Sequence, residues 1–447
     1  MTELKQLQKK VLVLSHDIAG KHMAGPGIRY VSIADELSKY FDVTLGLLDG
    51  EADQIRDISS SYSYKVQSYD DKDYKSLIDE ADYIFAQHIN PEMLSYIRAQ
   101  NKRLIFDFYS PVPIEFMIYR YFSETGYGKT EQQELDNLIE LYKQYVTYGD
   151  YFVCSNNYQR DLWTGFFLAA GILNKRPETF TDLDQLIGLS PMGIDDQEPT
   201  HNKNVLRNVI PGINQDDFIL IWTGGLWDWF DPLTVVKAVE QLHQSNPKIK
   251  LVFMGVKHPN SKVPAMSEAK KTLDYIKSQG LESKCIFILD QWMPFDERIN
   301  YLLEADAAIY MHKSSLETRY SHRSRVLDHI YAELPTIASG GDYLGDEVVG
   351  NRGLGVVVEE DNHQALTEAI NRLVQDDELL KSIKSNIRSA KEEFFWENTT
   401  KDLVSYIQEH EPVNHLPTKI KQVKASGGVT FFLRRVIRKV KRRVLQG

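Results

Sequence analysis

Residues 218–232 read FILIWTGGLWDWFDP. The apolar run from Phe218 to Trp222 predicts a buried strand, and two adjacent glycines follow its end, where they let a backbone approach a ligand closely. Pro232 suits the first turn of a helix, and the pattern stays helical to Ser245. A strand, a glycine-containing loop and a helix in this order indicate a βαβ unit, in which the strands are parallel.

The N-terminal half repeats this pattern. Val11–Leu14 predicts a strand, the loop 17–27 follows, and a helix extends from about residue 28 to 40. The loop ends in AGPGIR, residues 24–29. Further strands are predicted at Val43–Leu48, Tyr83–Ala86, Leu104–Phe108 and Tyr151–Cys154, and further helices at 131–148 and 158–170.

A polar, turn-rich segment, Ser190–Asn214, separates the two series and predicts an interdomain linker. The second series predicts strands at Leu251–Met254, Ile286–Leu289, Ala307–Tyr310 and Thr336–Ala338, helices at 265–279, 296–304, 323–333 and 363–375, and one long helical segment at 377–409. The fold class is therefore α/β, with two doubly wound parallel sheets in tandem. We expect them to meet at a cleft, with ligands outside the carboxyl ends of the strands.

The composition excludes several classes of protein. The 447 residues are 42% hydrophobic and 26% charged, which is typical of a globular protein. No apolar run approaches 18 residues and no signal-peptide core follows the N-terminus, so we expect a cytosolic protein without a membrane-spanning helix. Cys154 and Cys285 have no CxxC partner, and no clustered Cys/His or HExxH motif indicates a metal site.

The charge is unevenly distributed along the chain. Residues 412–447 contain ten Lys and Arg and no Asp or Glu, which leaves a net charge of −21 on residues 1–411. Leu433, Val436, Ile437, Val440 and Val444 form one helical stripe after the flexible pair Gly427-Gly428. This pattern predicts an amphipathic helix on an anionic membrane surface. A nucleic-acid arm or a helix that docks on a protein partner is the alternative. The membrane contacts would be Phe431, Phe432, Arg434, Arg435, Arg438, Lys439, Arg442 and Arg443.

Three arginines lie just before or at the start of the helix predicted at 323–333. Arg319, Arg323 and Arg325 oppose the helix dipole there, which costs about 0.3–1 kcal/mol for each cation. An anion such as a diphosphate between the arginines and the helix amides would offset this cost. Asp328, one turn further, could accept hydrogen bonds from sugar hydroxyls. The alternative is a solvated charged face without a ligand.

Other candidates follow predicted strands. Gly25, Gly27 and Arg29 could hold a phosphate at a helix N-terminus, or form only a tight turn. Gly224 and Gly225 favour close approach of a ligand, whereas the aromatic residues of 227–230 could equally fill a core. His88 follows the strand at 83–86 and is a candidate acid or base, and His16 and Asp17 have a similar position. A purely structural histidine is the alternative in each case.

Taken together, these segments resemble bacterial glycosyltransferases of the GT-B architecture, near the large retaining family four, the group 1 transferases. The resemblance covers roughly residues 10–410. It rests on the order and spacing of Gly25–Arg29, Phe106–Pro111, Ser190–Gly193, Gly224–Trp229 and Glu317–Pro335.

The resemblance implies a role for each candidate residue. The family binds a nucleotide-diphosphate sugar in the C-terminal domain and the acceptor in the N-terminal domain. Asp328 matches the second acid of the family's paired-acid motif, while Tyr320 stands where the first is usual. Glu317 is expected to substitute for that first acid as a catalytic residue, or else the sugar hydroxyls are held by other groups. Gly225 stands where the family usually has an Arg, so Arg323 and Arg325 are expected to bind the diphosphate. Arg319 and Lys257 are the next candidates for binding the diphosphate. Trp292 lies in the loop that holds the nucleotide base in the family, and His88 matches the family's histidine near the anomeric carbon.

The resemblance also implies the organisation and activity. Residues 1–194 form the acceptor domain, completed by a crossover helix at about 392–411. Residues 195–391 form the nucleotide-sugar domain, and 412–447 a basic linker and membrane-surface helix. The expected activity is retaining transfer of a hexosyl or deoxyhexosyl group to a lipid-linked glycan at the inner face of the cell membrane, for a surface polysaccharide or glycolipid, without a cofactor or metal. A nucleotide-sugar epimerase and a non-catalytic partner protein are the alternatives.

Overall fold

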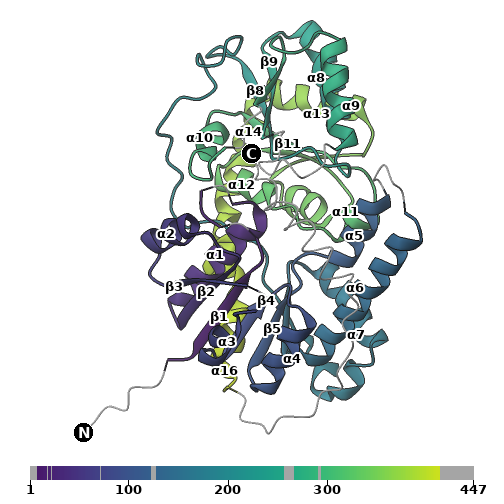
Figure 1. The fold of residues 1–447 in the computed structure, drawn as a ribbon. Coiled ribbons are helices and arrows are strands. Elements are labelled where there is room, and N and C mark those ends of the chain that lie inside the picture. The colour runs from purple at the N-terminus through teal and green to yellow at the C-terminus, as the bar shows by residue number, and fades with distance from the viewer. Residues whose placement is uncertain are drawn as a thin grey trace, which may run out of the picture. The chain divides into compact units, whose positions relative to one another are not determined.

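The computed structural model describes residues 8–17, 19–21, 23–70, 72–121, 127–255, 266–289 and 293–412. Contacts divide these residues into two compact units (Figure 1). Unit 1 comprises the chain up to Pro113, then Gly128–Gly193, and the segment that begins at Trp396. Unit 2 comprises Ile114–Tyr127 and Ile194–Phe395. We describe each unit separately.

Unit 1 is built on a seven-stranded parallel sheet with the order β3-β2-β1-β4-β5-β6-β7. The central strands are continuous apolar runs because both faces of a parallel sheet are covered by helices. In β1, for example, every residue from Val11 to Leu14 is buried. The strands are β1 Lys10–Ser15, β2 Asp42–Leu48, β3 Lys65–Tyr69, β4 Tyr83–Ala86, β5 Arg103–Asp107, β6 Tyr151–Cys154 and β7 Ile187–Leu189.

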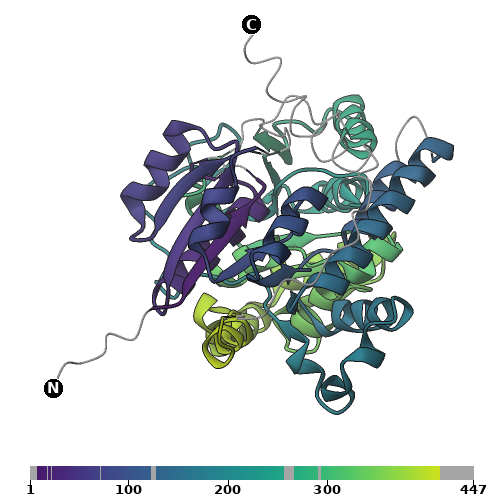
Figure 2. The same cartoon turned by 60° about the horizontal axis from the view of Figure 1, so that its bottom comes forward.

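The helices of unit 1 connect these strands. They are α1 Gly25–Ser38, α2 Ala52–Ser61, α3 Lys75–Glu80, α4 Pro91–Ala99, α6 Lys129–Tyr148, α7 Asn157–Ala169, α15 Trp396–Thr399 and α16 Lys401–Glu409. Helix α5, Val112–Tyr121, starts in unit 1, and its contacts from Ile114 onward belong to unit 2. Figure 2 brings α16, the yellow helix, to the front.

The end of α16 is fastened to the residue that precedes β1. Lys9 Nζ donates hydrogen bonds to the carbonyl oxygens of Ile407, Gln408 and His410, at 2.9, 2.9 and 3.1 Å. A cation at this place satisfies carbonyls that have no partner within the helix and complements its dipole. Tyr83 Oη also donates to the His410 carbonyl. The last described helix is thus held at the amino ends of β1 and β4.

Unit 2 contains a six-stranded parallel sheet with the order β10-β9-β8-β11-β12-β13. Its strands are β8 Phe218–Thr223, β9 Ile249–Met254, β10 Ile286–Leu289, β11 Ala307–Tyr310, β12 Thr336–Ser339 and β13 Gly355–Val358. Its helices are α8 Pro232–Ser245, α9 Ser267–Ser278, α10 Arg298–Leu303, α11 Leu316–Tyr320, α12 Arg325–Tyr331, α13 His363–Gln375 and α14 Asp377–Ala390, with a π-helical turn at Leu344–Gly350.

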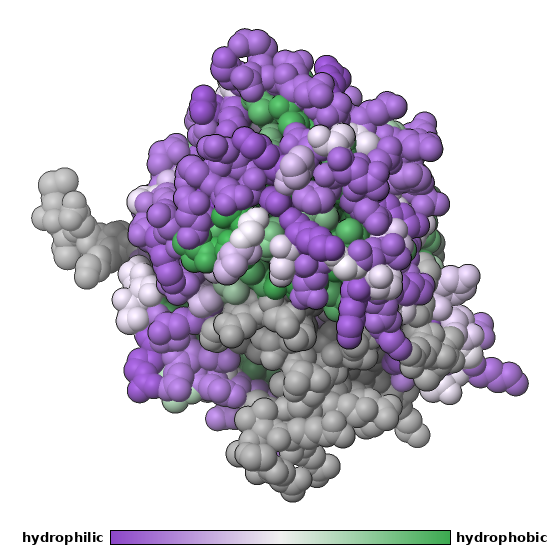
Figure 3. All heavy atoms as spheres, turned by 90° about the horizontal axis from the view of Figure 1, so that it is seen from above, coloured by the Kyte–Doolittle hydropathy of each residue, from purple (hydrophilic) through white to green (hydrophobic). Residues whose placement is uncertain are grey.

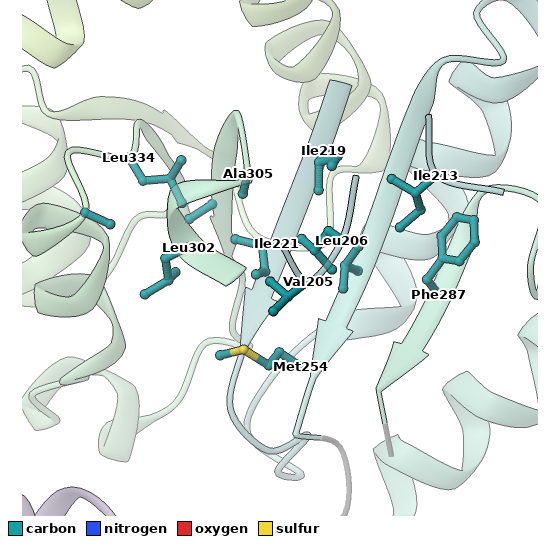
Figure 4. Packing of buried hydrophobic residues seen from close by; sticks show 13 residues of the cluster. Val205, Leu206, Ile213, Ile219, Ile221, Met254, Phe287, Leu302, Ala305 and Leu334 are labelled. Atoms are coloured by element: carbon teal, nitrogen blue, oxygen red, sulfur yellow. The ribbon is translucent and has the colours of Figure 1, made fainter. Parts of the chain in front are cut away.

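Part of the unit 2 core is shown in Figure 4. Ile219 and Ile221 of β8 lie beside Val205 and Leu206, which come from the segment before the sheet, and all four are buried. The polar segment predicted as a linker thus contributes apolar side chains to the core of unit 2. The same cluster includes Met254, Phe287, Leu302, Ala305 and Leu334.

The predicted fold class, two parallel-sheet α/β domains, is confirmed, and the predicted strands lie within a residue or two of their expected positions. The long helix predicted at 377–409 is wrong. It is interrupted after α14, where Phe395 is extended, with φ −60° and ψ 144°. Here the Ile194 N–H donates to the Phe394 carbonyl at 2.8 Å and Ile194 forms a bridge with Phe395, so backbone pairing competes with the helix.

Several predicted residues lie outside the part of the chain that the structure describes. They are Lys257, Trp292 and the basic segment beyond residue 412. Among the described helices, none combines the length and apolar character needed to span a bilayer. The face shown in Figure 3 is mostly hydrophilic, and hydrophobic side chains show only in small recesses between polar ones.

Candidate functional site

The candidate site of unit 2 lies where its strand order reverses, between β8 and β11. In open α/β sheets, ligands bind outside the carboxyl ends of the strands at this point. Gly224 and Gly225 follow β8 directly, and His312 lies two residues beyond the end of β11. Two of the expected nucleotide-sugar residues are therefore at the position that the topology favours.

Gly224 has a backbone conformation that requires glycine. Its φ is +79°, and its N–H donates to the Met254 carbonyl at 3.0 Å, which fixes the loop beside β9. A Cβ at this position would lie 3.4 Å from Nη2 of Arg325, the same nitrogen that donates to the Gly225 carbonyl at 3.4 Å. The glycine loop therefore lies directly against an arginine side chain.

Arg325 is a partly buried cation without an acidic partner among the described residues. Its guanidinium lies 4.1 Å from the centre of the Phe230 ring and 5.5 Å from that of Trp222. No carboxylate of the described residues lies within ion-pair distance of it, and its Nη1 has no hydrogen-bond partner. Burial, together with the charge of Arg323, lowers the pKa of Arg325 to about 9. Such a charge is costly unless an anion binds it.

Arg323 has a partner of its own. It forms an ion pair with Glu317, and the two side chains are 10% and 1% exposed. Burial opposes the charge of Arg323, but Glu317 more than compensates and raises its pKa. The guanidinium also lies 5.4 Å from the centre of the Trp229 ring. The catalytic role expected for Glu317 stays a prediction; the structure buries its side chain and pairs it with Arg323.

Asp328 lies on α12 and contacts Arg298, a residue that the sequence pattern did not indicate. The Arg298 Nη2 donates to the Asp328 carboxylate at 2.9 Å. Burial raises the pKa of Asp328, although the charges of Arg298 and Arg325 oppose this rise. Its side chain remains 23% exposed, so it keeps surface for a ligand hydroxyl. Arg319, on α11, is exposed.

A second cluster missed from the sequence lies at the ends of β11 and β12. The Tyr310 hydroxyl donates to the Asp342 carboxylate, and His312 Nε2 is 3.6 Å from the same side chain. All three residues are completely buried. His312 lies two residues after a predicted strand, so its position at the carboxyl edge of the sheet could have been predicted from the sequence. Its partner Asp342 has no such signal.

The candidate site of unit 1 also lies where the strand order reverses, between β1 and β4. His16 follows β1, His88 follows β4, and the two rings are 4.8 Å apart in a T-shaped arrangement. Burial lowers the pKa of His16 to about 4. Burial, and to a lesser extent His16, lowers the pKa of His88 well below its usual value. Both imidazoles are therefore uncharged at neutral pH.

Arg29 was expected to contact a phosphate, but its side chain is buried in the interior of unit 1. Its Nε and Nη2 donate to the two carboxylate oxygens of Asp107 at 2.7 and 2.8 Å, and Nη2 also donates to the Ser190 carbonyl at 2.8 Å. Both charged side chains are fully buried. The phosphate contact predicted for Arg29 is replaced by this bidentate pair. Gly25 and Gly27 lie in the first turn of α1, earlier than the predicted helix start.

The aromatic residues after Gly225 divide into two groups. Phe230 is buried at 1% exposure, beside Trp222 and Arg325, and belongs to the core. Trp227 and Trp229 are half-buried and stack with their ring centres 5.2 Å apart. No group of three or more His, Cys, Asp or Glu side chains suited to a metal ion occurs in the described residues.

Comparisons with known proteins agree with this geometry. Residues 208–390 match the family model described as glycosyl transferases group 1. Anabaena HepE in complex with UDP-glucose is similar in structure, with a TM-score of 0.58 and 15% identity over 90% of this chain and 100% of that one. Sucrose-phosphate synthase from Thermosynechococcus elongatus has a TM-score of 0.55 and 12% identity, covering 90% and 99%.

A third similar structure is WaaG, described as a glycosyltransferase involved in lipopolysaccharide biosynthesis. Its TM-score is 0.55 and its identity 12%, over 90% of this chain and 100% of that one. A comparison by sequence with the curated proteins found no match. The chain has the two-domain α/β fold of the GT-B glycosyltransferases. Within that fold, residues 208–390 match the family model of the glycosyl transferases group 1.

Proposed function

We propose that this protein transfers a sugar from a nucleotide-diphosphate sugar to a hydroxyl group of a glycan acceptor. The observation that supports this most directly is Arg325, a partly buried cation at the strand-end position where such sheets bind ligands, with no acidic partner in the described part of the chain. A diphosphate would supply the missing negative charge. The group 1 domain match includes this residue.

The same arrangement suits the chemistry of transfer. When the bond between the sugar and the diphosphate breaks, negative charge grows on the leaving phosphate, and fixed cations stabilise it. Arg325 would neutralise this charge directly. Asp328 would accept hydrogen bonds from ligand hydroxyls. Because these cations can supply the charge compensation, we propose that no resident metal is needed and that EDTA leaves donor binding unchanged.

The test is thermal unfolding of the full chain with UDP-, GDP-, dTDP- and CDP-sugars. A ligand at 100 times its dissociation constant stabilises a protein by about 2.7 kcal/mol, which raises the melting temperature by several degrees. We expect one nucleotide to produce this shift and Arg325→Ala to abolish it. The matched control is Arg352→Ala, since Arg352 is partly exposed and already paired with Glu393. A flat response to every donor would contradict the proposal.

The type of sugar, the stereochemistry of transfer, the acceptor and its location are proposed from the sequence. We propose a hexosyl or deoxyhexosyl group, transfer with retention, and a lipid-linked acceptor at the inner face of the cytoplasmic membrane. The product would be a surface polysaccharide or glycolipid. The basic, amphipathic pattern of residues 430–445 supports the membrane location, because it favours an anionic membrane surface. The sugar and the retention follow only from the resemblance to the family. Analysis of the anomeric configuration of the product tests retention.

One observation favours a second candidate, a non-catalytic protein that binds a nucleotide sugar. The Glu317 carboxylate forms an ion pair with Arg323, and Tyr320 stands where the family has an acid. A chain that binds a donor in the unfolding assay but neither transfers nor hydrolyses its sugar would support this candidate. Release of nucleoside diphosphate during incubation would exclude it.

A further inference from the structure

The tryptophan pair, Trp227 and Trp229, lies in a turn that follows the glycine loop. The two indole planes differ by only 3°, and the ring centres are 5.2 Å apart. Between them, the Asp228 carboxylate accepts the backbone N–H of Glu268, at the start of α9, at 2.9 Å. The Lys313 N–H donates to the Trp229 carbonyl at 3.0 Å. Because its backbone is fastened to two other segments, the turn presents the two rings as one preorganised surface.

The tryptophan pair is not used up by the core of unit 2. Both rings are half-buried, and Nε1 of Trp229 has no hydrogen-bond partner. Nε1 of Trp222 has none either, but that ring is completely buried, whereas Trp229 keeps part of its surface exposed. Trp163 is typical of a buried indole, since its Nε1 donates to the Phe108 carbonyl at 3.2 Å. A ligand that lies on the tryptophan pair could bring the missing acceptor to Trp229.

The tryptophan pair adjoins the residues to which we assign the diphosphate. A Cβ at Gly225 would lie 3.2 Å from Nε1 of Trp227, and the Gly225 carbonyl accepts a hydrogen bond from Arg325 at 3.4 Å. On the other indole, the Arg323 guanidinium lies 5.4 Å from the centre of the Trp229 ring. A ligand whose diphosphate contacts Arg325 can therefore extend onto the indoles.

The order of the strands indicates which part of a nucleotide-diphosphate sugar lies there. Strands β10 and β11 are on opposite sides of β8. The loop after β10 is expected to hold the base, and Arg298 of α10, the helix after that loop, contacts Asp328. The backbone of the tryptophan turn pairs instead with the segment after β11, because Phe230 forms a bridge with His312. With the base at β10 and the diphosphate at β8, the sugar ring is the part that reaches the tryptophan pair.

We propose that the tryptophan pair binds the C–H face of the donor's sugar ring and thereby selects the sugar, an inference that rests on the proposed function for the donor itself. The face of an indole is negative and attracts C–H groups, whose hydrogens carry a small positive charge. A pyranose ring presents such a face, and its oxygen atoms can accept the N–H of Trp229. The expected ligand is a hexosyl or deoxyhexosyl group stacked on the indoles.

The test compares binding of a donor with binding of its nucleoside diphosphate alone, by isothermal titration calorimetry of the full chain. The probes are UDP-glucose, UDP-galactose, GDP-mannose, dTDP-rhamnose and CDP-glucose, each beside the free nucleotide. We expect Trp227→Leu and Trp229→Leu each to weaken donor binding about three- to tenfold and to leave nucleotide binding unchanged. Trp229→Phe should restore most of the affinity. Phe180→Leu, at an exposed aromatic residue of unit 1, is the control.

Two results would overturn the inference. One is an equal loss of donor and nucleotide affinity in a variant whose melting temperature is unchanged, which would place the base on the indoles. The other is unchanged donor affinity in both Leu variants, which would make the tryptophans part of the core only. In both cases the natural chain binds a donor, so the proposed function survives. A natural chain that binds none of the donors contradicts the proposed function, and this inference with it.

Discussion

Arg29 and Asp107 form a buried ion pair, and the consequence for stability depends on which partner is removed. Asp107→Asn leaves a guanidinium without a counter-charge in the interior, and breaking such a pair costs about 3–5 kcal/mol. We therefore expect unit 1 of this variant to unfold at a markedly lower urea concentration. Circular dichroism during urea titration measures the change.

The control for this prediction is Asp53→Asn. Asp53 pairs with Arg56 on the surface, where the side chains are 81% and 74% exposed and such pairs contribute at most about 1 kcal/mol. Replacement of both buried residues by apolar ones, Arg29→Met with Asp107→Leu, should recover part of the loss. Equal midpoints for Asp107→Asn and Asp53→Asn would show that the buried pair is not a stabilising contact.

At the scale of elements, Glu304 fastens the segment before β8 to the end of α10. Its carboxylate accepts the backbone N–H groups of Val205, Leu206 and Arg207 at 2.7, 2.8 and 2.8 Å, and it contacts His201. Burial alone would raise the pKa of Glu304, but these hydrogen bonds lower it below the ordinary value of 4.5. The stabilisation from a lowered pKa is complete above the ordinary value and is lost as pH falls through the folded-state pKa.

Glu304→Gln should therefore destabilise unit 2 by about 1–3 kcal/mol at pH 7, because an amide has one acceptor oxygen for several donors. The difference from the natural chain should shrink as the pH falls below 4.5. Urea titrations at pH 7 and pH 3.5 measure both effects. Glu297→Gln is the control, since Glu297 is 45% exposed and only 3.5 Å from Lys203. A pH-independent difference would contradict the role of the charge.

Sequence predicted the central strands well because buried parallel strands are continuous apolar runs. It missed β3, β7 and β13, which are short or polar and lie at sheet edges, where fewer side chains need burial. In the site, the glycine loop and the arginines were predictable from local pattern. The Arg29–Asp107 pair was not, because only the folded chain brings its two segments together. The Arg323–Glu317 pair is local, but three arginines lie near Glu317 and the sequence pattern does not show which of them pairs with it.

At the scale of the whole molecule, the basic segment beyond residue 412 is expected to hold an acidic body at a membrane. A chain that ends at residue 426 should lose binding to vesicles that contain phosphatidylglycerol, because it lacks seven of the ten basic residues. Co-sedimentation measures this, and vesicles of phosphatidylcholine are the control. Raising the salt from 0.1 to 0.5 M should weaken binding of the full chain. A shortened chain that still sediments fully would refute the prediction.

The hydrogen bonds from Lys9 to the end of α16 mean that the two ends of the described chain meet at one edge of unit 1. Proteins with adjacent ends tolerate circular permutation, because a short linker replaces a contact that already exists. Residue 412 could be joined to residue 8, and new termini could be opened after α7 at the exposed residues Asn174 and Lys175. The strands would then follow one another in a different order along the chain, while each strand kept its neighbours within its sheet.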